Sequence, residues 1–156
     1  MTIDHRQLQD LEDRARHRGT GLQCEDILGC WQLTTIWPKG RQETNALSGW
    51  FLRSLGACLD ISAGRNADLQ LRNAVNLGPL CLQFQGPGHL RGRRPLLVFQ
   101  FEQVELKLGQ LTLLKRMLPS PTQGREPFFA LISRSNDGWM AARGRGGGLA
   151  LWTLKG

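Results

Sequence analysis

The side chains that most often carry out chemistry are few in this chain and lie far apart in the sequence. His5 and His17 belong to a polar N-terminal segment, and His89 follows a Gly-Pro-Gly turn signal. Glu102 and Glu105 flank an expected strand bend, where a carboxylate is usually solvated or paired with Arg. A general base needs a partner within hydrogen-bond reach, and a metal site needs several ligands at characteristic spacing. These residues form no such set, so the sequence predicts no enzymatic activity, no metal site and no cofactor.

The four cysteines are Cys24, Cys30, Cys58 and Cys81. They show neither Cys-x-x-Cys spacing nor a His at zinc-finger spacing, and Cys58 and Cys81 lie in apolar runs where a thiol packs as a small hydrophobe. The N-terminus lacks an apolar signal segment, and no run approaches the roughly 20 apolar residues of a spanning helix. We therefore expect a soluble protein made in a reducing compartment, with peripheral membrane contact at most.

Aromatic side chains are the remaining candidates for a binding site. Six of them could line a calyx: Trp37, Trp50, Phe84, Phe99, Phe101 and Trp152. Ligand pockets are mostly apolar and carry few polar groups, which suits this set. For each one alone, ordinary core packing is the favoured interpretation, and only the set, placed within a barrel, favours binding of an apolar ligand.

Basic side chains give the 156-residue chain a formal charge of +7. Those expected at turns are Arg91, Arg93, Arg94 and Arg145, and the N-terminal segment adds Arg14, Arg16 and Arg18. A basic residue near an anionic membrane contributes about 1 kcal/mol to binding, and the same residues also suit the phosphates of a nucleic acid. The turn arginines are therefore candidates for membrane or anion contact, although a solvated turn is the simplest role for any one of them.

Hydrophobic periodicity indicates which elements would position these residues. Apolar residues at helical spacing predict a helix over Asp4–His17, capped by Asp4 and ended near Gly19–Gly21. From Trp31 onward the period changes to two. The expected strands cover Leu28–Trp37, Ala57–Ser62, Leu69–Leu77, Leu80–Gln85, Leu96–Leu108, Phe128–Ser133, Trp139–Arg143 and Leu149–Leu154. About eight strands after one helix, with no βαβ rhythm, predict a mostly β fold, namely an antiparallel β-barrel of about eight strands with an N-terminal helix.

Three details bear on this prediction. Within Leu96–Leu108 the apolar parity slips by one residue, which a β-bulge or a sharp bend produces. Phe128–Ile132 and Leu149–Leu154 are apolar on both faces. This is expected in a closed barrel whose outside is partly covered by the helix or a partner. A dense β-sandwich is an alternative that fits the same pattern. Leu111–Arg125 is unplaced, and a turn of helix, a lid and a long loop all fit it.

The stretch Ile27–Leu33 resembles the Leu-x-Gly-x-Trp-x-Leu start of the plastid lipid-associated proteins, or fibrillins. Leu71–Val75 is similar to that family's Asn-containing central strand, Val98–Val104 to its Phe-Glu strand, and Ala142–Leu151 to its closing hairpin. The chain departs from the family at Thr35-Ile36 and at Met140, so it resembles a divergent, cyanobacterial-type member. The resemblance implies a helical leader over 1–22, a lipocalin-like barrel over 23–156, and a lipophilic ligand such as an isoprenoid, carotenoid, quinone or lipid.

The Gly-x-Trp start also suggests a structural plug made of Gly29, Trp31 and Arg143. The first and last strands of a barrel are neighbours, so an Arg near the end of the chain can lie across the Trp ring. Such a cation–π contact contributes about 0.5–2 kcal/mol. We therefore expect Gly29 to bring the strand close to the helix, and Trp31 with Arg143 to seal the closed end.

Taken together, these patterns favour a non-enzymatic lipocalin-like binding protein, cytoplasmic and peripheral to a thylakoid-type membrane. A protein partner in place of the small molecule stays open. One alternative is a basic β-barrel that binds nucleic acid, but this needs aromatic residues exposed beside Arg, so no nucleic acid is expected. A lipocalin-type bilin lyase or chaperone is a further alternative, for which the sequence offers no distinct acid and His arrangement.

Overall fold

A computed structural model describes residues 3–39, 58–66 and 68–156 of the chain. The N-terminal helix α1 (His5–Arg18) starts at Asp4, whose carboxylate accepts a hydrogen bond from the Gln7 amide at 2.8 Å, while the Gln7 side chain accepts one from the Asp4 amide. It ends at Gly19, whose φ of 77° favours glycine. A Cβ at Gly19 would lie 2.6 Å from the Arg93 carbonyl oxygen, so this end of α1 meets a turn of the barrel closely. The predicted helix and its cap are confirmed.

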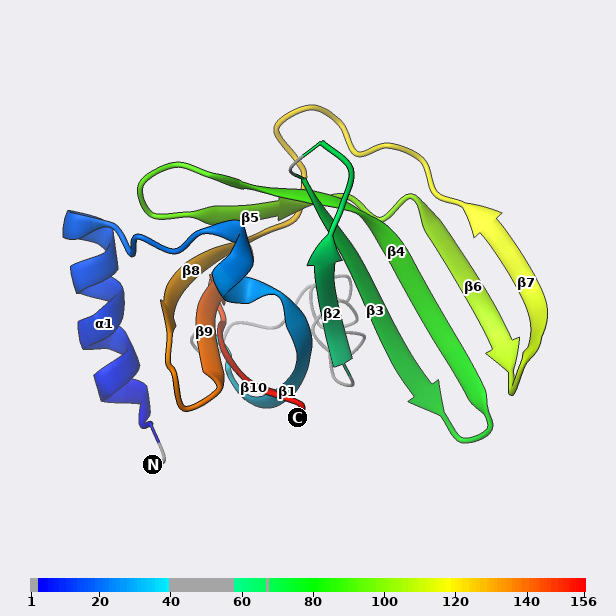
Figure 1. The fold of residues 1–156 in the computed structure, drawn as a ribbon, viewed down its shortest axis with the longest axis horizontal. Helices are drawn as coiled ribbons and strands as arrows, with labels where there is room; N and C mark the ends of the chain where they lie inside the picture. Colours follow the sequence, from blue (N-terminus) through cyan, green and yellow to red (C-terminus); the bar gives the residue numbers. More distant parts are fainter. Residues whose placement is uncertain (1–2, 40–57, 67) are drawn as a thin grey trace.

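A 3₁₀ turn, η1 (Cys24–Ile27), leads into ten strands among the described residues (Figure 1). They are β1 (Gly29–Trp37), β2 (Cys58–Ala63), β3 (Leu69–Leu77), β4 (Leu80–Arg91), β5 (Leu96–Phe99), β6 (Gln103–Leu108), β7 (Leu111–Met117), β8 (Phe128–Arg134), β9 (Trp139–Gly144) and β10 (Leu149–Leu154). Eight of them form a closed antiparallel barrel in the order β3-β2-β1-β10-β9-β8-β5-β4, which the β3–β4 pairing closes. The predicted mostly β barrel with one N-terminal helix is therefore confirmed.

Strand β4 changes its partner halfway along. Its first half, Leu80–Gln85, pairs with β6, and its last residues pair with β5. Gly86 lies at the change, where a Cβ would clash with the Gln100 carbonyl oxygen. The predicted turn at Gly86 is therefore wrong, because the glycine serves a close approach of chains inside a continuous strand. The expected slip in Leu96–Leu108 is confirmed as the break between β5 and β6.

Strands β6 and β7 form a hairpin outside the barrel, in the order β4-β6-β7 (Figure 1). We call the four-stranded region made of Asn73–Leu77, Leu80–Gln85, β6 and β7 the sheet extension. β7 falls in the segment that the sequence left unplaced. It is a strand because it pairs with β6 over Gln103–Leu108 across a Gly109-Gln110 turn, with a bulge between Leu106 and Lys107.

Two separate apolar clusters stabilise the fold. The larger one fills the barrel and includes Trp31, Phe99, Phe129 and Trp152. The smaller one lies between the outer face of the barrel and α1: Ile3, Leu8, Ile132, Ala141, Leu149 and Leu151. This second cluster confirms that strands with two apolar faces are covered outside by the helix.

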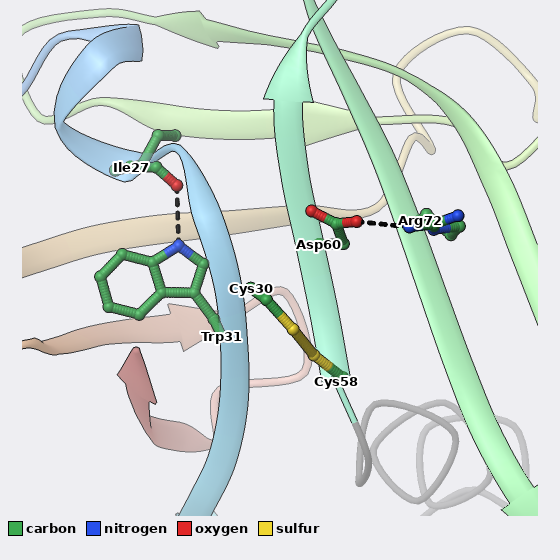
Figure 2. The surroundings of a disulfide bond; sticks show 6 residues. All are labelled: Ile27, Cys30, Trp31, Cys58, Asp60 and Arg72. Carbon is green, nitrogen blue, oxygen red and sulfur yellow. Dashed lines mark hydrogen bonds and ion pairs between the residues drawn. A yellow bond between two sulfur atoms is a disulfide. The ribbon is translucent and has the colours of Figure 1, made fainter. Parts of the chain in front are cut away.

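A disulfide joins Cys30 of β1 to Cys58 of β2, with their Cα atoms 6.3 Å apart (Figure 2). Cys24 and Cys81 are free. The sequence led us to expect thiols in a reducing compartment, and it missed this pair because the two residues lie 28 positions apart with no motif between them. Among the described residues, no helix has both the length and the apolar composition needed to cross a membrane.

Candidate functional site

Side chains, rather than an open calyx, occupy the interior of the barrel. The bulkiest of the fully buried residues in the larger cluster are Trp31, Trp152, Phe99 and Phe129. An eight-stranded barrel has an interior that side chains of this size can fill. A ligand site is therefore better sought where this core reaches the surface.

A row of five aromatic rings leads from the barrel core to the sheet extension. Successive ring centroids are 5.2–5.6 Å apart from Trp152 to Phe129, Phe99, Phe101 and Phe84. Four of the six predicted calyx residues thus lie together. Phe129 was missed, although its strand had been singled out as apolar on both faces. The row is part of the core at Trp152, and it reaches a partly buried position at Phe101.

The other two aromatic candidates do not join this row. Trp37 packs on the smaller cluster, and its ring centroid lies 5.9 Å from that of His5 at the start of α1. The structure therefore places Trp37 outside the barrel wall, against the helix. Trp50 lies outside the described residues.

Beyond Phe84, the inner face of the sheet extension continues the lining of the barrel. Residues opposite one another on antiparallel strands share a face. The registers define three rows across the four strands, ordered here towards the hairpin turns. The first row is Asn73, Phe84, Val104 and Arg116. The second is Val75, Leu82, Leu106 and Leu114, and the third includes Leu80, Leu108 and Leu111. We call the apolar members of these rows the apolar face: Val75, Leu80, Leu82, Phe84, Val104, Leu106, Leu108, Leu111 and Leu114. All nine come from two hairpins, β3–β4 and β6–β7, whose turns lie at the same end of the sheet.

Much of the large apolar surface exposed by the described residues lies at this hairpin. Exposed fractions are 43% for Leu108, 62% for Leu111, 49% for Leu113, 45% for Leu114 and 70% for Met117. The described chain has one further exposed large hydrophobic residue, Leu154. Leu108, Leu111 and Leu114 belong to the apolar face, whereas Met117 lies opposite Gln103 on the other face. Contiguous apolar surface on a protein typically marks a binding site. The signal in the sequence was the run Leu111–Leu114 directly after a glycine turn.

Charged groups divide unequally between the two faces of the extension. On the polar face, Glu105 forms ion pairs with Lys107 at 3.0 Å and with Lys115 at 3.7 Å. The Lys107 hydrogen bond lowers the pKa of Glu105 against the effect of desolvation. Arg116 lies on the other face, at the edge of the apolar rows. The two faces thus present different chemistry, with paired charges on one and a cation beside leucines on the other.

The predicted contact between Trp31 and Arg143 is wrong. Trp31 is buried inside the barrel, and its indole Nε1 donates to the Ile27 carbonyl at 2.7 Å (Figure 2). Arg143 points outward, because its register partner Leu149 belongs to the cluster under α1. Gly29 has a φ of 132°, and a Cβ there would lie 2.5 Å from the Leu154 side chain. The glycine therefore allows a close approach to the end of β10, not to the helix.

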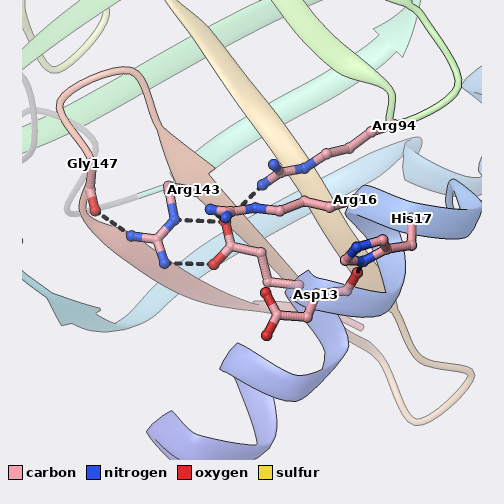
Figure 3. A network of polar contacts seen from close by, with 7 residues as sticks. Asp13, Arg16, His17, Arg94, Arg143 and Gly147 are labelled. Atoms are coloured by element: carbon pink, nitrogen blue, oxygen red, sulfur yellow. Dashed lines mark hydrogen bonds and ion pairs between the residues drawn. The ribbon is translucent and has the colours of Figure 1, made fainter.

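Arg143 instead bonds to Glu12 of α1, a residue that sequence reasoning missed. Figure 3 shows Arg143, Arg94 and Arg16 converging beside the helix. Its Nε donates to Glu12 Oε1 at 2.6 Å, and its Nη2 donates to Oε2. Arg94 and Arg16 donate to Oε1 at 2.7 and 3.1 Å. Burial raises the pKa of the Glu12 carboxyl, but Arg143, Arg94 and Arg16 together outweigh this effect and lower it from 4.5 to about 2. The carboxylate stays ionised and holds the helix on the barrel.

The arginines expected at membrane or anion contacts fall into different settings. Arg94 is bound to Glu12, and Arg145 donates to the backbone carbonyls of Glu126 and Gly124. Arg91 and Arg93 are exposed at the β4–β5 turn. That turn lies at the opposite end of β4 from the apolar face (Figure 1). The predicted basic turns and the exposed apolar surface are therefore separate features of the molecule.

Comparison of the chain with protein-family models, with curated proteins and with solved structures finds no match. The resemblance to the fibrillins thus stays a prediction.

Proposed function

We propose that this chain is a non-enzymatic binding protein for a lipophilic ligand, which lies on the apolar face. The observation that carries the proposal is the exposed leucine surface of the β6–β7 hairpin, which continues through Phe84 and Phe101 into the barrel core. Binding there removes apolar surface from water, which contributes roughly 25 cal/mol per Å². The packed barrel acts as a rigid support, and the extension provides the contact.

The class of ligand follows from the family resemblance. An isoprenoid, carotenoid, quinone or membrane lipid would suit an apolar sheet face with few polar groups. The setting would be cytoplasmic and peripheral to a thylakoid-type membrane. The Cys30–Cys58 disulfide is unusual for a reducing cytoplasm, so the oxidation state of the native protein bears directly on this location.

The two alternatives have less support. Binding of nucleic acid through base stacking needs exposed aromatic residues beside Arg, whereas Phe84, Phe99 and Trp152 are buried. For a bilin lyase or chaperone, no specific feature of the described residues adds support. A protein partner on the apolar face is a different occupant of the same surface, and the test below separates it from a small ligand.

The test uses one substitution at two exposed leucines. Leu114→Asp places a charge on the apolar face, and Leu154→Asp places the same charge on an exposed leucine elsewhere. Native mass spectrometry then measures loading with a decyl-tailed benzoquinone. We expect the wild type and Leu154→Asp to load at one ligand per chain, and Leu114→Asp to load at least about tenfold more weakly.

Equal loading of the two variants would overturn the apolar face as the site. Protein purified gently from a photosynthetic host provides the second arm, because extraction identifies any lipophilic molecule that it carries. A protein chain in stoichiometric complex, lost in Leu114→Asp and with no lipid bound, would overturn the small-ligand proposal.

A further inference from the structure

We propose that the ligand of the apolar face is an amphiphile with a single anionic head group, and that Arg116 binds this head. The inference depends on the proposed function, because it assigns the chemistry of the ligand at the same face. It adds a charge preference, so that a neutral carotenoid or quinone would bind the same face more weakly than an anionic lipid.

Arg116 is placed on the apolar face by two steps of strand register. Phe84 lies opposite Val104, and Val104 lies opposite Arg116. The three residues therefore share one row and one side of the sheet. Arg116 occupies the exposed end of this row on the edge strand β7, and Phe84 occupies the buried end beside the aromatic rings. A ligand on the apolar face would thus meet a cation at the outer edge of the sheet.

The guanidinium of Arg116 has no ion pair with another described residue. Glu105, on the facing strand, lies opposite Lys115 on the other face and bonds Lys107 and Lys115. Glu102 precedes β6 and is exposed, and it forms no ion pair with Arg116. The rows of the apolar face hold no carboxylate. A cation beside leucines and free of such a partner is available to an external anion.

Arginine is suited to this task because its planar guanidinium forms two parallel hydrogen bonds with a carboxylate or a phosphate. The direction of the strands then orients the rest of the ligand. From Val104, in the row of Arg116, to Leu108, at the hairpin turn, β6 extends by about 14 Å. Leu106, Leu108, Leu111 and Leu114 line this distance. A long alkyl tail therefore fits along the leucines when the head is held at Arg116.

The test compares hexadecanoate with hexadecanol, each below its aggregation limit at pH 8, by displacement of a bound fluorescent probe. We expect the wild type to bind the carboxylate about tenfold more tightly than the alcohol, as for one charge-assisted hydrogen-bonding pair. Arg116→Gln removes this preference and leaves the affinity for the alcohol unchanged. Lys115→Gln, the adjacent cation on the opposite face, retains the preference. A long-chain alkyl phosphate replaces the carboxylate in a parallel arm, which tells the two head groups apart.

Each other result has a definite meaning. Equal affinity for acid and alcohol in the wild type overturns the anionic head but leaves the proposed function standing. If Lys115→Gln also loses the preference for the acid, then general surface charge causes the preference. That result overturns the inference as well. If neither ligand binds, and light scattering shows a dimer that Leu114→Asp dissociates, the occupant is a second copy of the chain, and both proposals fail.

Discussion

The barrel wall under α1 and the sheet extension are built from similar leucine-rich strands, but only the first is covered. Leu8 of the helix is fully buried against Leu149 and Leu151 of β10. On the extension, Leu111 and Leu114 of the apolar face remain exposed. Burial of apolar surface is favourable in proportion to the area covered. The wall under α1 therefore contributes to the stability of the fold, whereas the surface of the extension becomes buried only when a ligand binds.

The two regions also differ in the burial and bonding of their carboxylates. Glu12 is 3% exposed and receives hydrogen bonds from three arginines of separate elements. Glu105 lies on a surface strand and bonds two lysines that are partly exposed. Exposed ion pairs contribute little, whereas removal of one partner from a buried set is strongly destabilising. The charge cluster at Glu12 therefore joins the helix to the barrel, whereas Glu105 bonds side chains of its own hairpin.

The largest expected effect comes from placing the same charge in each region. Leu8→Asp buries a carboxylate without a partner and should lower the free energy of unfolding by more than about 4 kcal/mol. Leu114→Asp, on an exposed position, should change it by no more than about 0.5 kcal/mol. Urea denaturation measures both values. Similar losses at the two positions would contradict the division into covered and open faces.

Sequence patterns predicted the covered region better than the open one. The helix has a capping residue and regular spacing, and β8 and β10 are apolar on both faces, so each carries its own local signal. Glu12 carries none, because its partner Arg143 lies 131 residues away. From the sequence alone, a charged helix residue is predicted to be solvated, because its distant partners are known only from the fold.

The open region was harder to predict for a different reason. The run Leu-Thr-Leu-Leu-Lys-Arg-Met of β7 contains good helix formers, and Pro119 and Pro121 after it favour the end of a helix. Pairing with β6 overrides this propensity. The candidate site was thus found in part: Phe84, Phe99, Phe101 and Trp152 were identified from the sequence, and the leucines and Arg116 beside them were not.

The next largest effect concerns the disulfide, which cross-links the barrel wall and not the extension. Loss of the Cys30–Cys58 bond, which closes a loop spanning 28 positions, should cost about 3–4 kcal/mol in the chain-entropy account. The double variant Cys30→Ser with Cys58→Ser tests this by urea denaturation, and Cys81→Ser serves as the control. Alkylation of the unreduced native protein should find two reactive thiols, Cys24 and Cys81. Four reactive thiols would show that the bond is absent in the native setting.

Acid should weaken the helix cluster in a specific pH range. Because the pKa of Glu12 is about 2 in the folded protein against 4.5 ordinarily, the unfolded chain binds more protons between these values. The stabilisation is therefore complete above about pH 4.5 and is lost as the pH falls towards 2. It amounts to on the order of 3 kcal/mol.

The variant Glu12→Gln isolates this contribution. It should be less stable than the wild type by about 3 kcal/mol at pH 7, and the difference should largely vanish near pH 2. Asp13→Asn, on the exposed side of the same helix, controls for the loss of one negative charge. A difference that persists at pH 2 would mean that packing of the side chain, and not its charge, holds the helix.

The smallest expected effect separates two arginines that the sequence grouped at one turn. Arg94 donates to Glu12, so Arg94→Gln should cost about 1–2 kcal/mol, since Arg143 and Arg16 still neutralise the carboxylate. Arg91 is exposed, and Arg91→Gln should change the free energy of unfolding by less than about 0.5 kcal/mol. Urea midpoints measured at low and high salt distinguish the two variants, because salt screens a partly buried ion pair less than a surface charge. Equal values for the two variants would assign Arg94 to the solvated turn, and the cluster that holds α1 would then reduce to Glu12 with Arg143 and Arg16.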